Sequence, residues 1–356
     1  MANAMHFFLG ANSPQGFQSL FEEFCRSEDL YDLLILKAGP GAGKSTMMRR
    51  IGEVMEERGE QVEYLHCSGD PKSLDGVFFS RIRTAVVDGT APHIVEPRYP
   101  AAVERYVDLG RFCDISASKK HREEIITHSE ACSAAYRAAY RMLAAAGKLD
   151  ENASALVLKG LDRSKLERRT DGIISREIKG KGSGGRDVCR FLGSITCEGE
   201  VWRFDSVEKL CQRVYLLLDS AGSGAYMLHR IHKAAQKRHF SSIICYDPEH
   251  KERLQHLLIP ELGLAFVTSR PGMEWPYGAY RRIHLDALVD ADHMRKWKGK
   301  IKFMRNMVKT LRGEGVDQLR AAREAHDALE AVYQPYINFD AVNELIQREI
   351  DRILSY

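Results

Sequence analysis

The chain has 356 residues, which is longer than one compact core usually supports and predicts two domains. Apolar residues make up 44% and charged residues 28%, so the chain is expected to be globular and not disordered. Its formal net charge of +3 is too close to neutral to indicate a nucleic-acid partner.

Residues 1–16 carry no basic segment ahead of a long apolar run, so they do not resemble a signal peptide. No apolar stretch approaches the roughly 18 residues of a membrane span, and no membrane partner is expected. The eight cysteines include no pair at CxxC spacing, which predicts neither a zinc site nor a dithiol redox motif. We therefore expect reduced thiols and a cytoplasmic location.

The first group of predicted elements is a strand, a loop and a helix. Residues 33–36 form a continuous apolar run, as a buried parallel strand requires. Residues 46–58 are typical of a helix with Met47 and Ile51 on one face. Between them, residues 38–45 read AGPGAGKS, which has the Walker A spacing with alanine at the first glycine position. In this order a glycine-rich loop binds phosphate, and a plain connection between strand and helix is the alternative.

The loop predicts how a nucleoside triphosphate would be held. Its glycines let successive amides point at the β-phosphate, and the helix N-terminus adds about half a positive charge. Lys44 can reach the β- and γ-oxygens as a catalytic residue, and the Ser45 hydroxyl can bind Mg²⁺, the expected cofactor. The expected nucleotide-binding residues are Gly39, Pro40, Gly41, Ala42, Gly43, Lys44, Ser45 and Thr46.

Asp88 is the candidate for a second magnesium contact. It ends the short apolar run at residues 85–87, and a site of this kind takes its second metal contact from an acidic residue at the end of a neighbouring strand. A turn or capping aspartate before Gly89 is the alternative.

Asp70 is the second candidate catalytic residue. It follows a predicted strand at residues 62–66, near the position of a substrate or an attacking water in an open α/β sheet. Its Asp-Pro setting suits a simple turn equally well. The neighbouring residues His66, Cys67 and His93 are interpreted as structural.

The chain also repeats itself. Five blocks of the first half recur in the same order in the second half, and chance similarity between two unrelated domains is the alternative. The paired blocks are 8–16 with 191–199, 33–51 with 215–231, 70–71 with 247–248, 81–92 with 261–272, and 105–114 with 281–290.

The repeat and a glycine-rich linker divide the chain. We expect an active domain at residues 1–178, a linker at 179–186 and a second domain at 187–356. The expected fold is α/β, with two tandem P-loop NTPase-like three-layer domains whose sheets are mostly parallel.

Each half is expected to end in a helical arm. Apolar residues at helical spacing predict antiparallel helical hairpins at about 117–178 and 290–356. The first long helix of each hairpin is expected to end at a glycine, Gly147 in one arm and Gly313 in the other.

The second copy of the loop has lost its charged groups. Alignment on the flanking strand and helix places Ala225 where the lysine belongs and Tyr226 where the magnesium-binding serine belongs, and Thr268 is the counterpart of Asp88. A copy without these groups is not expected to hydrolyse ATP. It would hold an anion on its backbone amides, or nothing.

Several strings resemble a poorly characterised family of bacterial tandem P-loop ATPases, and the resemblance extends over nearly the whole chain. Members of that family commonly carry a complete GxGKST loop in both halves, so the second half departs from the family here. The resemblance implies nucleotide binding and brings no known substrate. The strings are FLGANSPQGF, AGPGAGKSTMMRRIGE, HCSGDPKSLDG, VVDGTAPH and HDALEAVYQPYINFDAVNELI.

The leading expectation is a slow ATPase that hydrolyses ATP with Mg²⁺ in the first domain, and whose nucleotide state moves the arms or the second domain. One alternative is a small-molecule or nucleotide kinase with Asp70 near the acceptor hydroxyl. Another is a nucleotide-sensing binding module without significant turnover. ATP is preferred over GTP because the chain has no NKxD string. A protein partner or a homodimer is compatible with each alternative.

Overall fold

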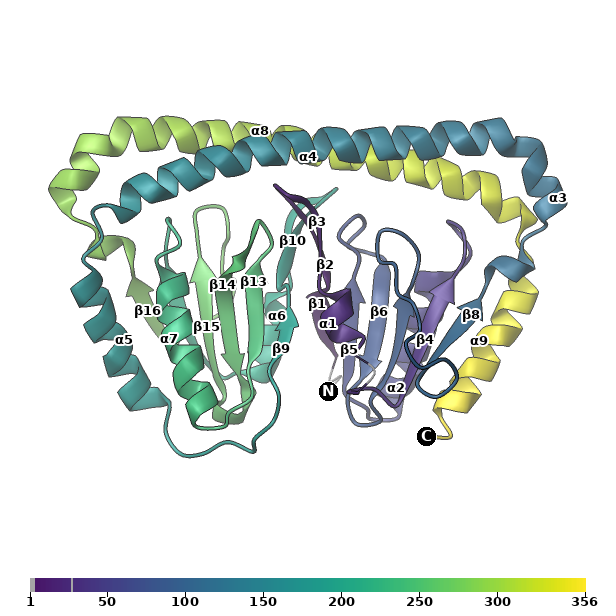
Figure 1. The fold of residues 1–356 in the computed structure, drawn as a ribbon, viewed down its shortest axis with the longest axis horizontal. Coiled ribbons are helices and arrows are strands. Elements are labelled where there is room, and N and C mark those ends of the chain that lie inside the picture. Colours follow the sequence, from purple (N-terminus) through teal and green to yellow (C-terminus); the bar gives the residue numbers. More distant parts are fainter. Residues whose placement is uncertain (1–3, 27) are drawn as a thin grey trace.

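The computed structural model describes residues 4–26 and 28–356, and these residues form an α/β protein with three sheets and two long helices (Figure 1). The expected α/β class is confirmed. Two of the sheets have six strands each and belong to the two halves of the chain, while the third lies between them.

The first six-stranded sheet carries the 38–45 loop. Its central strand β4 has a parallel neighbour on each side, and β6 is the one strand that runs antiparallel to both of its neighbours. In spatial order the strands are β1 (Met5–Phe8), β5 (Val62–His66), β6 (Leu74–Phe79), β7 (Thr84–Asp88), β4 (Asp32–Lys37) and β8 (Glu104–Asp108).

The second six-stranded sheet has the same architecture, as expected of a repeat. Strand β14 takes the place of β6 and runs antiparallel to both neighbours. In the corresponding order the strands are β9 (Val188–Arg190), β13 (Ile243–Asp247), β14 (His250–Ile259), β15 (Leu264–Ser269), β12 (Arg213–Leu218) and β16 (Arg281–His284).

The third sheet joins the halves. Each half contributes one antiparallel hairpin, and the two hairpins meet where Ile195 pairs with Asn12. Because the sheet is continuous across this pair, the halves are linked by backbone as well as by side chains. Its strands are β2 (Gly10–Ser13), β3 (Gly16–Ser19), β10 (Gly193–Thr196) and β11 (Gly199–Trp202).

Four of the described α-helices of each half have a counterpart in the other half, and one short helix has none. Within the described part of the chain, no helix is both long and apolar enough to cross a membrane. The α-helices are α1 (Phe21–Phe24), α2 (Lys44–Glu57), α3 (Ile115–Ser118), α4 (Arg122–Leu158), α5 (Arg163–Glu177), α6 (Phe204–Leu210), α7 (Gly224–Lys237), α8 (Ala291–Tyr333) and α9 (Phe339–Ile353). Short 3-10 turns lie at Gly110–Phe112, Lys119–His121, Pro260–Leu262, Asp286–Leu288 and Gln334–Tyr336.

The long helices α4 and α8 lie side by side and antiparallel across the top of both halves (Figure 1). With 37 and 43 residues they are about 55 and 65 Å long, so each reaches from its own half to the other. The expected hairpins, whose first helices were to end at Gly147 and Gly313, are therefore not formed. Helix α4 continues through Gly147, where a Cβ atom would lie 2.7 Å from Pro14 Cγ, so this glycine serves a close contact and no helix end.

The terminal helices are consequently exchanged between the halves. Helix α5, which precedes the expected linker at 179–186, packs with Leu166 and Ile173 on the second sheet. Helix α9, at the end of the chain, packs with Val342 and Ile346 on α2 and the first sheet. Each of these helices thus packs on the half of the molecule to which it does not belong in the sequence.

One apolar core is shared by both halves. Strand β4 directs Leu33 and Ile35 into it, and strand β12 of the second half contributes Leu216. The alternate residue Leu34 faces the opposite side of the sheet, toward α2. This period of two buries both faces of β4 and gives the continuous apolar run seen in the sequence.

The exchange predicts what happens when the linker at 179–186 is cut. A protease site placed there should be cleaved without separating the halves, since α5 and α9 each pack on the other fragment and the core is shared. Size-exclusion chromatography of the cleaved protein should give one species containing both fragments. Two fragments that elute separately and melt cooperatively by circular dichroism would contradict the exchange.

Candidate functional site

The 38–45 loop connects the end of β4 to the start of α2. Gly41 and Gly43 have positive φ angles of 71° and 89°, a region that residues with a Cβ atom rarely adopt. Gly43 is also the residue that caps α2, so the loop turns directly into the helix N-terminus. The remaining loop residues Gly39, Pro40 and Ala42 complete the turn, and Thr46 lies exposed in the first turn of α2.

Lys44 and Asp88 meet beside this loop. Strand β7 is the direct neighbour of β4, and their register pairs Leu36 with Asp88. The Lys44 Nζ lies 3.6 Å from Asp88 Oδ2, and both side chains are largely buried. Lys44 also donates hydrogen bonds to the carbonyl oxygens of Ala38 and Gly39, at 3.0 and 3.1 Å. The lysine is therefore folded back over its own loop.

The two expected magnesium contacts each have a protein partner. The Ser45 Oγ accepts a hydrogen bond of 3.0 Å from the backbone amide of Leu74, at the start of β6. The Asp88 Oδ1 accepts hydrogen bonds from the amide and hydroxyl of Thr90, at 2.8 and 2.6 Å. Asp88 thus makes the turn contact that was the alternative, while its other oxygen faces Lys44.

Asp70 is paired with an arginine of the long helix α8. Its Oδ2 accepts a hydrogen bond of 2.6 Å from Arg323, and its Oδ1 accepts one of 3.1 Å from the amide of Lys72. The second contact is the simple turn that the Asp-Pro sequence suggested. The first contact ties the loop after β5 to a helix from the other half of the chain.

The end of α8 also reaches the 38–45 loop itself. The amide of Gly41 donates a hydrogen bond of 3.1 Å to Glu330 Oε1. A Cβ atom at Gly41 would lie 3.3 Å from the Glu330 Cβ, so the helix is packed directly on the loop. Arg323 and Glu330 are two helical turns apart, or about 10.5 Å, so one helix touches both the loop and Asp70.

His66 is buried and uncharged. Its Nδ1 lies 2.9 Å from the Pro71 carbonyl oxygen, and its Nε2 lies 3.0 Å from His6 Nδ1. Burial, helped by the Arg203 guanidinium, lowers the pKa of His66 to about 3. This histidine is accordingly a neutral hydrogen-bonding residue of the core near neutral pH.

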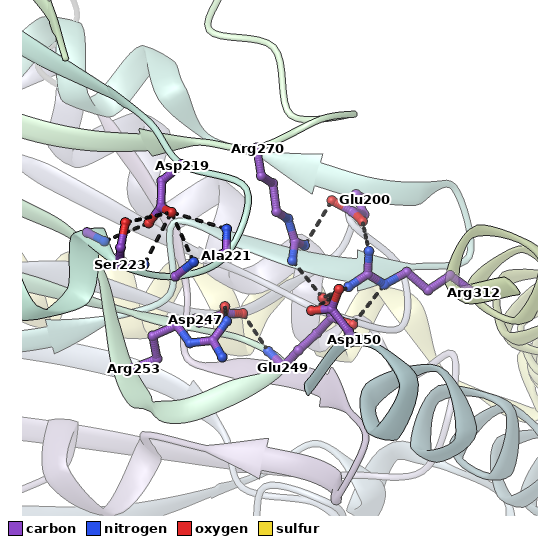
Figure 2. Close-up of polar contacts among 12 residues, drawn as sticks. Asp150, Glu200, Asp219, Ala221, Ser223, Asp247, Glu249, Arg253, Arg270 and Arg312 are labelled. Carbon is purple, nitrogen blue, oxygen red and sulfur yellow. Dashed lines mark hydrogen bonds and ion pairs between the residues drawn. The ribbon is translucent and has the colours of Figure 1, made fainter. Parts of the chain in front are cut away.

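In the second half, an internal carboxylate fills the corresponding loop (Figure 2). Asp219 Oδ1 accepts hydrogen bonds from the amides of Ala221, Gly222 and Ser223, at 3.0 to 3.2 Å, and from the Ser223 hydroxyl. Its Oδ2 accepts one of 2.6 Å from the amide of Gly224, at the start of α7. These are the inward-pointing amides that could otherwise hold an anion.

The alignment of the second loop shifts by one residue in the structure. Both helices have 14 residues, and α7 begins at Gly224 where α2 begins at Lys44. Gly224 therefore takes the lysine position and Ala225 the serine position, in place of the expected Ala225 and Tyr226. The pairing of Thr268 with Leu217 matches that of Asp88 with Leu36, as expected.

A network of charged side chains lies beside the second loop (Figure 2). Glu249 is almost fully buried and accepts hydrogen bonds from Arg270 and from Arg312 of α8. Burial alone would raise the pKa of Glu249, but the two guanidiniums hold it below its ordinary value. Glu200 of β11 pairs with both arginines, and Asp150 of α4 pairs with Arg312. Both long helices are therefore anchored here by charge.

Three residues, Glu330, Arg323 and Asp219, were not found from the sequence. Glu330 and Arg323 lie on a helix about 250 to 290 residues away from their partners, and no local pattern marks them. Asp219 could have been noticed, because it stands directly before the degenerate loop at the end of an apolar strand.

Comparison of the chain with protein-family models, with curated proteins and with solved structures found no match.

Proposed function

We propose that the protein is an ATPase that binds Mg-ATP on the 38–45 loop of its first half. The observation that carries the proposal is the meeting of Lys44 and Asp88, 3.6 Å apart, beside a glycine loop that opens a helix. A lysine and a metal-binding carboxylate at this place serve phosphoryl transfer. A cytoplasmic location, where ATP and free thiols coexist, fits the eight free cysteines.

Each residue of the site has a role in this proposal. The loop amides and the α2 N-terminus would bind the β-phosphate. Lys44 would exchange the carbonyls of Ala38 and Gly39 for phosphate oxygens, and Ser45 and Asp88 would hold Mg²⁺. The bound cation would neutralise charge that develops on the phosphoryl oxygens. Catalysis would then be mostly electrostatic.

Helix α8 would couple the nucleotide to the rest of the molecule. A phosphate on the Gly41 amide would compete with the Glu330 carboxylate, because both are anions that need the same donor. Binding of the triphosphate would therefore displace the end of α8. Arg323, which lies two turns before Glu330 on the same helix and pairs with Asp70, would move with it. In this proposal Asp70, paired with Arg323, is the second catalytic residue and would lie near the transferred phosphoryl group.

A small-molecule kinase, which would use the same 38–45 loop, is the second candidate. A cavity of about 1140 Å³ is lined among others by Phe21, Glu22, Pro92, Arg98 and Arg186. Its charged walls, which include Arg98, could take a charged acceptor molecule. Phosphate release from Mg-ATP alone would favour the ATPase, whereas phosphate transfer that depends on a pool of candidate acceptors would favour the kinase. A nucleotide-sensing module would bind ATP with neither phosphate release nor phosphate transfer.

The first prediction from this proposal concerns the Lys44–Asp88 pair. Lys44→Ala should lower ATP turnover by at least about 100-fold, since phosphoryl transfer depends on this charge. Asp88→Asn should weaken nucleotide binding in the presence of Mg²⁺ much more than in its absence. Lys37→Ala, at the end of β4 and before the loop, is the matched control and should retain turnover. Near wild-type hydrolysis by a folded Lys44→Ala protein would refute the proposed site.

The second prediction concerns the contact between α8 and the loop. Glu330→Gln keeps the shape of the side chain and removes the charge that competes with phosphate. We expect the Kd of a non-hydrolysable ATP analogue to fall about tenfold, or about 1.4 kcal/mol. Glu324→Gln, exposed on the same helix, should leave the Kd unchanged. Unchanged or weaker binding by Glu330→Gln, measured by calorimetry, would show that α8 does not compete with the nucleotide.

A further inference from the structure

A buried group of three metal-ligating side chains lies on the first sheet. Cys67 follows β5, Asp75 lies in β6 and His93 lies in the loop after β7, three strands that are neighbours in space. Their ligand atoms all lie within 4.8 Å of one another. The three residues therefore converge from separate segments onto one point.

One buried nitrogen of this group has no hydrogen-bond partner in the protein around it. Asp75 and His93 are 4% and 6% exposed, and the His93 Nε2 lies 3.1 Å from Asp75 Oδ2. Among the described residues, the buried His93 Nδ1 has no hydrogen-bond partner, while the buried Asp75 Oδ2 faces the His93 imidazole. A buried polar atom left without a partner costs about 1–3 kcal/mol, so the His93 Nδ1 calls for an explanation.

The surroundings hold the imidazole in place. The rings of Phe17 and Phe21 pack against His93, with centroids 5.0 and 4.6 Å away. Burial favours the neutral form of His93, while the Asp75 carboxylate outweighs it and raises the pKa of the imidazole. Burial likewise keeps the pKa of the Cys67 thiol well above its ordinary value.

We propose that Cys67, Asp75 and His93 bind a divalent cation of the zinc class. Thiolate and imidazole ligands select Zn²⁺ over Mg²⁺ or Ca²⁺, which prefer oxygen ligands only. Three protein ligands leave a fourth position for water or a ligand, as in catalytic zinc sites. Binding releases the thiol proton, and the imidazolium proton where one is present, so apparent affinity rises with pH.

The group lies close in the sequence and the sheet to the proposed nucleotide site, but the metal proposal does not depend on nucleotide binding. The residue before Asp75, Leu74, donates its amide to Ser45, and His93 follows Asp88 by five residues. Among the described residues, two equivalent positions of the second half do not carry these ligands: the strand register places Gln255 at the position of Asp75, and Met273 follows Thr268 as His93 follows Asp88. Two of the metal ligands and the phosphate-loop lysine are thus missing from the same half.

The test is metal binding by the full chain in the absence of nucleotide. Protein purified with Zn²⁺ in the medium and dialysed should contain about one zinc per chain by elemental analysis. After removal of zinc, titration with Co²⁺ should give one site with a thiolate-to-cobalt charge-transfer band. Cys67→Ser should abolish the band, and Asp75→Asn and His93→Gln should each weaken binding by at least about 10- to 100-fold.

Cys132→Ser, a cysteine on α4 outside the group, is the matched control and should bind as the wild type does. Circular dichroism of each metal-free protein would separate loss of a ligand from loss of the fold, and Asp75→Asn preserves the side-chain shape. Wild-type protein that takes up neither zinc nor cobalt, or folded variants that bind as tightly as the wild type, would overturn the metal site. Neither result would bear on nucleotide binding.

Discussion

The structure depends on the antiparallel pairing of α4 and α8. The two helices cross where Ala139 and Leu143 of α4 pack on Leu319 of α8, over the sheet that joins the halves. Gly315 allows the close approach, because a Cβ atom there would lie 3.0 Å from a Leu143 methyl carbon. This packing fixes the direction in which each helix leaves its own half. Everything that α8 contributes to the first half, including Glu330 and Arg323, follows from it.

The two halves keep one architecture but differ in charge at equivalent places. At the first loop a lysine stands near a carboxylate, and the loop amides include Gly41, held by a carboxylate of another helix. At the second loop the carboxylate of Asp219 is part of the loop itself and is bound by four of its amides. The Glu330 carboxylate belongs to a separate helix and would be displaced by phosphate, whereas the Asp219 carboxylate belongs to the loop that binds it. The proposed single nucleotide site follows from this difference.

The sequence predicted the α/β class and the strand, loop and helix around residues 38–45, because both depend on local periodicity and glycine spacing. It did not predict the helix exchange, since Gly147 was interpreted as a helix end and the partner of α4 lies about 170 residues further on. The group of Cys67, Asp75 and His93 has no motif spacing and exists only because β5, β6 and β7 are adjacent. Nucleotide binding itself stays a prediction.

One titration tests the account most directly. Calorimetry with a non-hydrolysable ATP analogue and Mg²⁺ should saturate at one site per chain, because the first loop offers Lys44 and Asp88 while the second is filled by Asp219. The same titration of Lys44→Ala should show greatly weakened binding, with no second site revealed. Two equivalent sites in the wild type would contradict the assigned role of Asp219. Absence of binding to the wild type would contradict the central claim that the 38–45 loop holds a nucleoside triphosphate.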